Sequence, residues 1–109
     1  MYQRGDIVSV NFPFTDGSGS KWRPAIILSN NLISSSGDLV VVMITSQIRS
    51  SDITVELTPN LLSVPLPKNS FAKCHRLYAV EATLVQAKYG SLTADGMKQI
   101  LDAVVSIIS

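Results

Sequence analysis

The chain has 109 residues, of which 46% are hydrophobic and 16% charged, a balance that favours a compact globular protein over a disordered one. A net charge of +1 excludes a strongly basic coat for nucleic acid, so any polyanion must be held by a local patch. The single cysteine, Cys74, excludes an internal disulfide, and one cysteine with one histidine is too few for a structural zinc site.

The length predicts a single domain over residues 1–109. The first ten residues lack a basic segment followed by an apolar one, so no secretion signal is expected. No apolar stretch approaches the roughly 18–20 residues that span a bilayer. We therefore expect a soluble, cytoplasmic protein without membrane contact.

The first half of the chain predicts three strands and two loops. Residues 6–12 alternate in polarity, whereas residues 23–29 and 39–46 hold consecutive apolar positions typical of strands buried on both faces. Residues 13–21 contain a proline, small turn formers and two glycines, which predicts the mobile tip of a long hairpin. A second loop is expected at 29–38.

The second half predicts further strands around an irregular connection. A strand is expected at 52–58, with Ile53 and the alternate apolar residues pointing inward. The segment 59–69 carries three of the five prolines, which indicates an irregular connection or a sheet edge. Residues 70–84 predict one or two more strands.

From residue 93 the apolar spacing changes to i, i+3, i+4 and i+7, which predicts a C-terminal helix. Thr93 is the expected N-cap, and Asp95 falls in the first turn, where the helix dipole favours an anion. Five or six short strands and one helix are most economically arranged as a small antiparallel barrel with the helix packed on it.

Arg23 precedes a proline at the start of an apolar strand. Pro24 has a fixed φ and restricts Arg23 to an extended conformation. The pair therefore predicts a long cation at the rim of a rigid, buried element. The alternative is a surface arginine that only closes the end of the strand.

Several stretches together resemble the MazF/PemK (Kid-like) toxins of type II toxin–antitoxin systems. The segment GDIVSVNFPFTDGSGSKWRPAIILSN is followed by VVMITSQ, and YGSLTADGMKQIL is similar to the closing segment of that family. The resemblance covers the order of elements from residue 4 to the C-terminal helix. It is most specific in the N-terminal half, at Gly5 to Val8, Gly17, the Arg23-Pro24 pair and Ile44 to Ser46.

The resemblance implies a mainly β fold, an SH3-like, partly open antiparallel barrel with a C-terminal α-helix, usually as a homodimer. It implies a sequence-specific endoribonuclease that cleaves single-stranded RNA, commonly mRNA, without a metal or other cofactor and so inhibits translation and growth. A cognate antitoxin neutralises such a toxin, and any contact with DNA is indirect, through the antitoxin.

Two residues match the catalytic pair of the family. Arg23 matches its catalytic arginine, and a guanidinium suits the phosphorane because it stays charged and pairs with phosphate bidentately. Thr45 matches its catalytic threonine, at the end of a buried strand, where its hydroxyl can donate to a phosphate oxygen. The alternative for Thr45 is a residue that caps the loop beginning at Ser46.

The third catalytic position departs from the family. Where many members carry an acidic residue, this chain has His75, followed by Arg76. An imidazole titrates near neutrality, so we expect His75 to contribute acid–base chemistry or to contact phosphate when protonated. The alternative is a partly buried histidine or one that faces the dimer partner.

The expected RNA contacts extend beyond the catalytic residues. Basic side chains are expected to bind phosphates, the aromatic ones to stack on unpaired bases or to anchor the hairpin, and the glycines to let the loop close. These RNA-binding residues are Phe14, Gly17, Ser18, Lys21, Trp22, Ser46, Gln47, Arg49, Lys73 and Arg76.

Two other functions remain open. One is a gyrase-poisoning toxin of the CcdB type, which shares the fold without the nuclease chemistry; the other is a non-catalytic SH3-like interaction module. Cys74 beside His75 suggests a nucleophile pair, but successive strand residues point to opposite faces, so we expect Cys74 to be a small buried residue.

Overall fold

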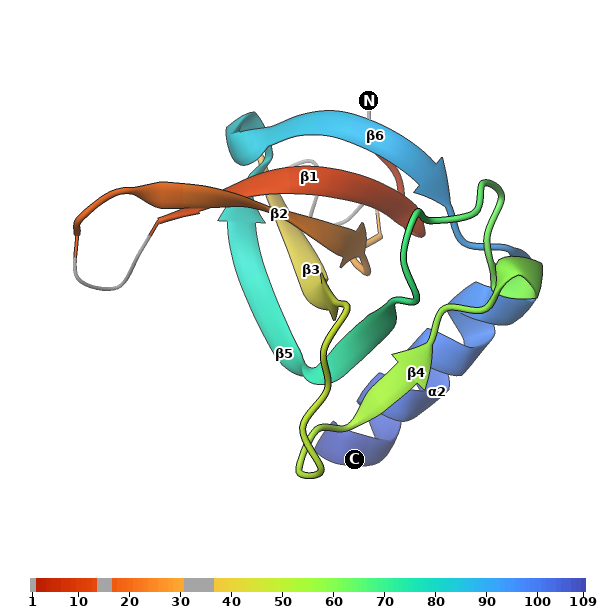
Figure 1. The fold of residues 1–109 in the computed structure, drawn as a ribbon. Coiled ribbons are helices and arrows are strands. Elements are labelled where there is room, and N and C mark those ends of the chain that lie inside the picture. Colours follow the sequence, from red (N-terminus) through yellow and green to blue (C-terminus); the bar gives the residue numbers. More distant parts are fainter. Residues whose placement is uncertain (1, 14–16, 31–36) are drawn as a thin grey trace.

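The computed structural model describes residues 2–13, 17–30 and 37–109. Within these ranges six strands form one antiparallel sheet in the order β4-β5-β3-β2-β1-β6, followed by one α-helix (Figure 1). The elements are β1 (Asp6–Pro13), β2 (Ser20–Ile27), β3 (Asp38–Thr45), β4 (Thr54–Glu56), η1 (Pro59–Leu61), β5 (Phe71–Glu81), η2 (Ala82–Leu84), β6 (Val85–Ser91) and α2 (Ala94–Ile108). The predicted mainly β fold with a C-terminal helix is confirmed. The sheet curls but is open, with β4 and β6 at its two ends.

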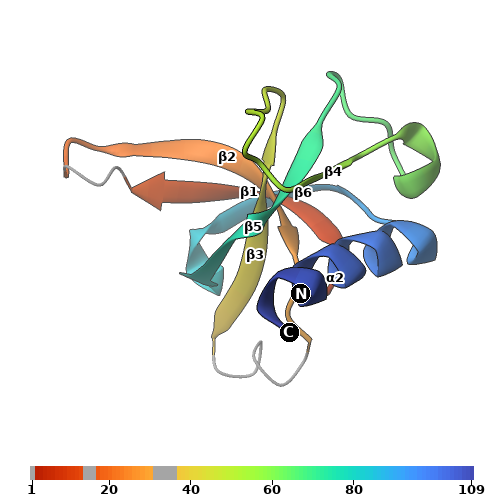
Figure 2. The ribbon, with the colours of Figure 1, turned by 90° about the horizontal axis from the view of Figure 1, so that it is seen from below.

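The three central strands are covered on both faces by apolar side chains. One core packs around Ile26, Val42 and Ile100, and a second around Val10 and Val41 on the opposite face. Both faces of β1, β2 and β3 contribute, which explains why residues 25–28 are apolar without alternation and are all buried. Figure 2 shows α2 along one side of the curled sheet, where it contributes to the first core.

The C-terminal helix begins as predicted. Thr93 is its N-cap and accepts a hydrogen bond from the Gly96 amide at 3.1 Å. A Cβ on Gly96 would lie 2.7 Å from the carbonyl oxygen of Leu61, so a glycine here lets α2 pack directly against η1. No helix in the described ranges is long and apolar enough to cross a membrane.

One strand prediction was wrong, and one strand was missed. Ile53 is 46% exposed instead of inward-facing, because β4 starts only after it and the chain turns between Arg49 and Asp52. The strand β6 was not predicted at all, because only Val85 of its seven residues is buried and its apolar alternation is correspondingly weak.

The strand β5 bends sharply where it passes β3 (Figure 1). Lys73 pairs with Met43, whereas Leu77 pairs with Val42, the residue before Met43, so residues 74–76 are left without a partner on β3. Such an irregularity increases the local twist and bends the strand. The bend gives the second half of β5 a different direction from the first half.

Asp52 holds the connection between β3 and β4 in place. Its carboxylate accepts a hydrogen bond from the Arg49 amide at 2.8 Å and lies 3.8 Å from Lys73 Nζ. The Arg49 amide lowers the pKa of Asp52 below its ordinary value of 3.8; partial burial opposes this effect, and nearby positive charge, first that of Lys73, adds to it. The ionised carboxylate therefore stabilises the folded chain.

We expect Asp52→Asn to lower the melting temperature at pH 7, with the gap to wild type closing as the pH falls below about 4. The sign follows from the lowered pKa of Asp52. The carboxylate stabilises the fold at any pH above its ordinary pKa, and this stabilisation is lost as the pH falls through its pKa in the folded state. Thermal unfolding between pH 7 and pH 2.5 measures the gap, with exposed Asp38→Asn as the control. A gap independent of pH would contradict this role for the carboxylate.

Candidate functional site

A groove of about 670 Å³ opens where β2 and β3 separate. Pairing between the two strands ends at Ala25 opposite Met43. Arg23 and Thr45 each lie two residues beyond that last pair, and both line the groove. The structure thus brings the two residues expected for catalysis to one rim.

Among the described residues that line the groove there are cations but no carboxylate. Its walls come from the first half of β2, the end of β3, the proline-rich segment before β5, and β6. The lining residues are Lys21, Trp22, Arg23, Pro24, Ile44, Thr45, Ser46, Val64, Pro65, Leu66, Pro67, Lys68, Ser70 and Tyr89. Three basic side chains without an acidic one favour an anionic ligand.

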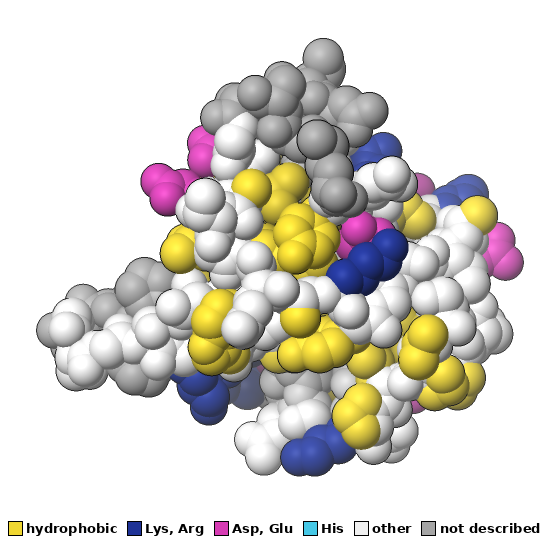
Figure 3. Space-filling view, turned by 90° about the horizontal axis from the view of Figure 1, so that it is seen from above, with side chains coloured by type: hydrophobic (Ala, Val, Ile, Leu, Met, Phe, Trp, Pro, Cys, Tyr) yellow, Lys and Arg dark blue, Asp and Glu magenta, His cyan; other side chains and the backbone are white. Residues whose placement is uncertain are grey.

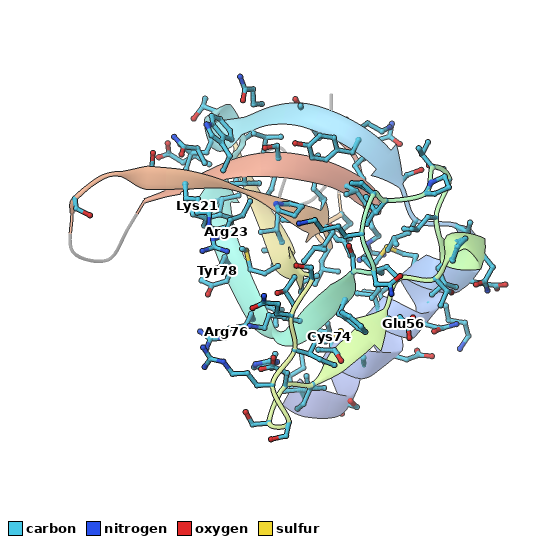
Figure 4. The ribbon with its side chains drawn as sticks, in the orientation of Figure 1. Lys21, Arg23, Glu56, Cys74, Arg76 and Tyr78 are labelled. Atoms are coloured by element: carbon cyan, nitrogen blue, oxygen red, sulfur yellow. The ribbon has the colours of Figure 1, made fainter. Side chains whose placement is uncertain are left out.

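The basic side chains beside the groove are available for a ligand. Figure 4 shows Lys21 and Arg23 on β2, with Arg76 and Tyr78 of β5 on the same side of the molecule. Within the described ranges, the side chains of Lys21, Arg23 and Arg76 form no ion pair. An anion reaching this side would therefore not have to displace a carboxylate.

The outer face of β1 and β6 is different. Figure 3 shows hydrophobic side chains in the middle of that view, with basic side chains scattered around them and no continuous basic surface. A local cluster therefore fits the small net charge better than a basic coat would.

The Thr45 hydroxyl is engaged in a local turn. Its Oγ1 donates to the Gln47 carbonyl oxygen at 2.8 Å and accepts from the Gln47 amide at 3.1 Å. This is the loop-capping role that the sequence left open as an alternative. The turn also fixes the hydroxyl at the groove mouth, where a phosphate oxygen could replace the Gln47 carbonyl as its acceptor.

His75 lies outside the groove lining, in the bend of β5. Its Nδ1 is 3.3 Å from the Ile53 amide nitrogen, and its Nε2 is 3.5 Å from Asp52 Oδ1. Nδ1 also lies 3.4 Å from the Ile53 carbonyl oxygen, so whether it donates or accepts depends on the tautomer of the ring. These contacts hold the ring beside Ile53 and Asp52 and away from the described groove lining.

The other expected RNA contacts are spread over several parts of the molecule. Ser46, Lys21 and Trp22 line the groove, whereas Gln47 forms the turn with Thr45. Arg49 and Lys73 lie around Asp52, and Arg76 lies in the bend of β5. Gly17 and Ser18 are exposed near the tip of the hairpin that projects from the sheet in Figure 1, and Phe14 lies outside the described residues.

The sequence interpretation missed one whole wall of the groove. Residues 64–68 and Tyr89 line it, although the former was predicted only as an irregular connection and the latter was not considered. Two prolines spaced by one residue, at 65 and 67, indicate an extended and rigid segment. That pattern does not reveal that the segment faces β2.

Cys74 is fully buried, as predicted. Its burial raises the pKa of the thiol, which disfavours the nucleophilic thiolate. In the described part of the chain, no three His, Cys, Asp or Glu side chains gather into a group that could hold a metal ion.

Solved structures of similar fold come from bacterial toxins. An endoribonuclease in complex with its cognate antitoxin, from a mycobacterial species, is 22% identical, with a TM-score of 0.76 over 99% of this chain and 95% of the other. MazF in the MazE–MazF structure from Deinococcus radiodurans is 18% identical, with a TM-score of 0.78 over 98% and 95%. The Mycobacterium tuberculosis toxin MazF-mt6 is 17% identical, with a TM-score of 0.71 over 96% of each chain. At these identities the likeness shows the fold.

The sequence itself matches a family. No curated protein sequence matches the chain, but the family of PemK-like, MazF-like toxins of type II toxin–antitoxin systems matches residues 3–108. That match spans nearly the whole chain, in agreement with the antiparallel sheet and the C-terminal helix. The protein therefore belongs to the PemK-like, MazF-like toxins of type II toxin–antitoxin systems.

Proposed function

We propose that the protein is a sequence-specific endoribonuclease that cleaves single-stranded RNA, commonly mRNA, without a metal. This cleavage inhibits translation and growth. Its family membership supports a toxin. The observation that carries the nuclease activity is the meeting of Arg23 and Thr45 at the mouth of a groove whose described lining has three cations and no carboxylate.

The reaction uses the nucleophile of the substrate itself. The 2′-oxygen attacks the adjacent phosphorus and loses its proton, the bond from phosphorus to the 5′-oxygen breaks, and that oxygen gains a proton. The products are a 2′,3′-cyclic phosphate and a 5′-hydroxyl. The protein must stabilise the extra negative charge on the phosphorane and assist both proton transfers.

Arg23 is the residue placed to stabilise that charge. Pro24 restricts its backbone, and β2 is anchored by the buried residues that follow, so the guanidinium projects from a rigid support. Thr45 donates its hydroxyl proton to a phosphate oxygen in place of the Gln47 carbonyl. Lys21 and Lys68 bind neighbouring phosphates on the two sides of the groove.

His75 contributes in one of two ways. Either it takes part in proton transfer after leaving Ile53, or it contacts phosphate as an imidazolium next to Arg76. A pH profile distinguishes both from a structural role.

The proposed partners follow from the family. A cognate antitoxin covers the groove, DNA is contacted only through that antitoxin, and the toxin acts in the cytoplasm as a homodimer. The exposed apolar side chains on the last turns of α2 support self-association: Val105, Ile107 and Ile108 are 52%, 37% and 71% exposed.

We expect wild-type protein to cut a long single-stranded RNA at defined sites in EDTA, leaving 2′,3′-cyclic phosphate ends. Arg23→Ala and Thr45→Val each remove a group that stabilises the phosphorane, so cleavage should fall by about 10²–10³-fold. Initial rates by gel electrophoresis and end-group analysis measure this. Thr45→Ser keeps the hydroxyl and should retain most of the activity.

Lys98→Ala is the matched control, because it removes a cation from the outer face of α2, where Lys98 pairs with Asp102. Its cleavage rate should equal that of wild type. A folded wild-type protein that cuts no RNA at any pH from about 5 to 9 would reject the nuclease. That result would favour a gyrase poison or a binding module.

A separate expectation concerns His75. His75→Ala should lower the cleavage rate and flatten its dependence on pH between about 5 and 9, because the one histidine, the proposed proton-transfer group, is removed. Single-turnover rates across that range measure the change, and His75→Gln controls for lost packing. An unchanged rate with an unchanged pH profile would show that the histidine has no part in the reaction.

A further inference from the structure

The proline-rich wall of the groove is held against β6. The Ser63 amide donates to the Ser91 carbonyl oxygen at 2.8 Å, and the Ser91 amide donates to Ser63 Oγ at 2.9 Å. A Cβ on Gly90 would lie 3.2 Å from Ser63 Oγ, so the absent side chain allows this close approach. The wall therefore starts from a fixed point next to Tyr89.

The far end of the same wall is also fixed. Ser70 Oγ donates to the Lys68 carbonyl oxygen at 2.9 Å, and the Leu57 amide donates to the Ser70 carbonyl oxygen at 2.8 Å. Between the two anchors, Pro65 and Pro67 have restricted φ angles. A wall that is ordered before binding loses little conformational entropy when a ligand enters.

A bulge directs Tyr89 into the groove. Ile7 of β1 pairs with Gly90, but Val8 pairs with Lys88, which leaves Tyr89 without a partner on that strand. Bulges of this kind redirect a side chain. Tyr89 lines the groove and yet is 53% exposed, and Trp22, from a different wall, is 47% exposed.

An apolar wall and two exposed aromatic rings are not needed to bind phosphate. They provide flat surfaces on which unpaired bases stack, while the basic rim holds the chain that links those bases. The absence of any carboxylate from the described lining favours a polyanion over a basic or neutral peptide. Together these features distinguish the base-binding part of the groove from its phosphate-binding mouth.

We propose that the space between Tyr89, Trp22 and residues 64–67 binds an unpaired base of single-stranded RNA next to the cleaved phosphate, with Tyr89 as the stacking residue. This inference rests on the proposed ribonuclease function and deepens it, because it names the part of the groove that contacts bases. Arg23 and Thr45 act on the phosphate, whereas Tyr89 acts on the adjacent base.

Binding can be measured without cleavage. A 2′-O-methyl oligonucleotide of mixed sequence lacks the attacking hydroxyl, and an abasic oligonucleotide of the same length keeps the phosphates alone. Trp22 is the one tryptophan in the chain, so its fluorescence reports directly on the groove. Titration with each probe gives the affinity for bases and phosphates separately.

We expect Tyr89→Ala to weaken binding of the base-bearing probe by about 5- to 150-fold and to leave the abasic probe within about twofold. Tyr89→Phe keeps the ring and should bind both probes like wild type. Lys98→Ala, at an exposed residue of α2 that does not line the groove, is the control and should also match wild type.

Equal affinities of wild type and Tyr89→Ala for the base-bearing probe would overturn the inference, as would an equal loss for both probes. Failure of the base-bearing probe to bind at all would also overturn the inference. A protein partner would then be the better candidate for the ligand of the groove. The proposed function is tested separately by cleavage. A wild type that cuts RNA while Tyr89→Ala binds normally refutes only the base site, whereas predicted binding without cleavage refutes only the nuclease.

Discussion

The burial of both faces of the central strands constrains everything else in this fold. Strands β1, β2 and β3 have one apolar core on each side, so their middles have no surface on which polar chemistry could be built. Only the ends of these strands reach solvent. In β2 the exposed half comes first in the chain and ends immediately before the buried half. The candidate site is therefore confined to the place where β2 and β3 separate. This explains why a cation and a hydroxyl from different strands meet there.

The two sides of the groove arise in different ways. On one side, the positions of Arg23 and Thr45 depend on the rigid pairing of β2 with β3, which stops two residues away from each of them. The opposite wall depends on prolines, on the serine contacts between residues 63 and 91, and on a bulge that redirects Tyr89. One side thus presents groups suited to phosphate and the other presents surfaces suited to bases. A ribonuclease that discriminates between sequences requires both.

Much of the scaffold could be predicted from local patterns. The apolar run from Ala25 to Leu28 indicated a strand buried on both faces, and the spacing after Thr93 indicated the helix and its cap, because these signals depend on neighbours in sequence. Arg23 and Thr45 were expected at one rim as the ends of two such strands. Thr45 does end β3, but Arg23 lies within β2, which begins at Ser20, and it reaches the rim because β2 and β3 stop pairing at Ala25 and Met43. The strand β6 could not be predicted, because a single buried residue leaves almost no pattern.

The missing half of the site depends on contacts between distant residues. Tyr89 faces the groove because of the register of β6 with β1. Residues 64–68 face β2 because their segment is anchored to β6. Neither arrangement is encoded in a local sequence pattern. His75 was assigned from its position in a motif, but the bend in β5 places it beside Asp52 and Ile53 and outside the groove lining. Irregular pairing accounts for the positions of Tyr89 and His75: Tyr89 is the extra residue between Lys88 and Gly90 in β6, and His75 is one of the three residues of β5 that have no partner on β3.

The central claim is that RNA lies in the groove between β2, β3 and the proline-rich wall. Photocrosslinking of an uncleavable single-stranded RNA containing 4-thiouridine, followed by mass spectrometry of the attached peptides, tests it most directly. The account predicts crosslinks to the peptides that carry Trp22, residues 64–68 and Tyr89. Crosslinks confined to α2, with none in these three segments, would contradict it.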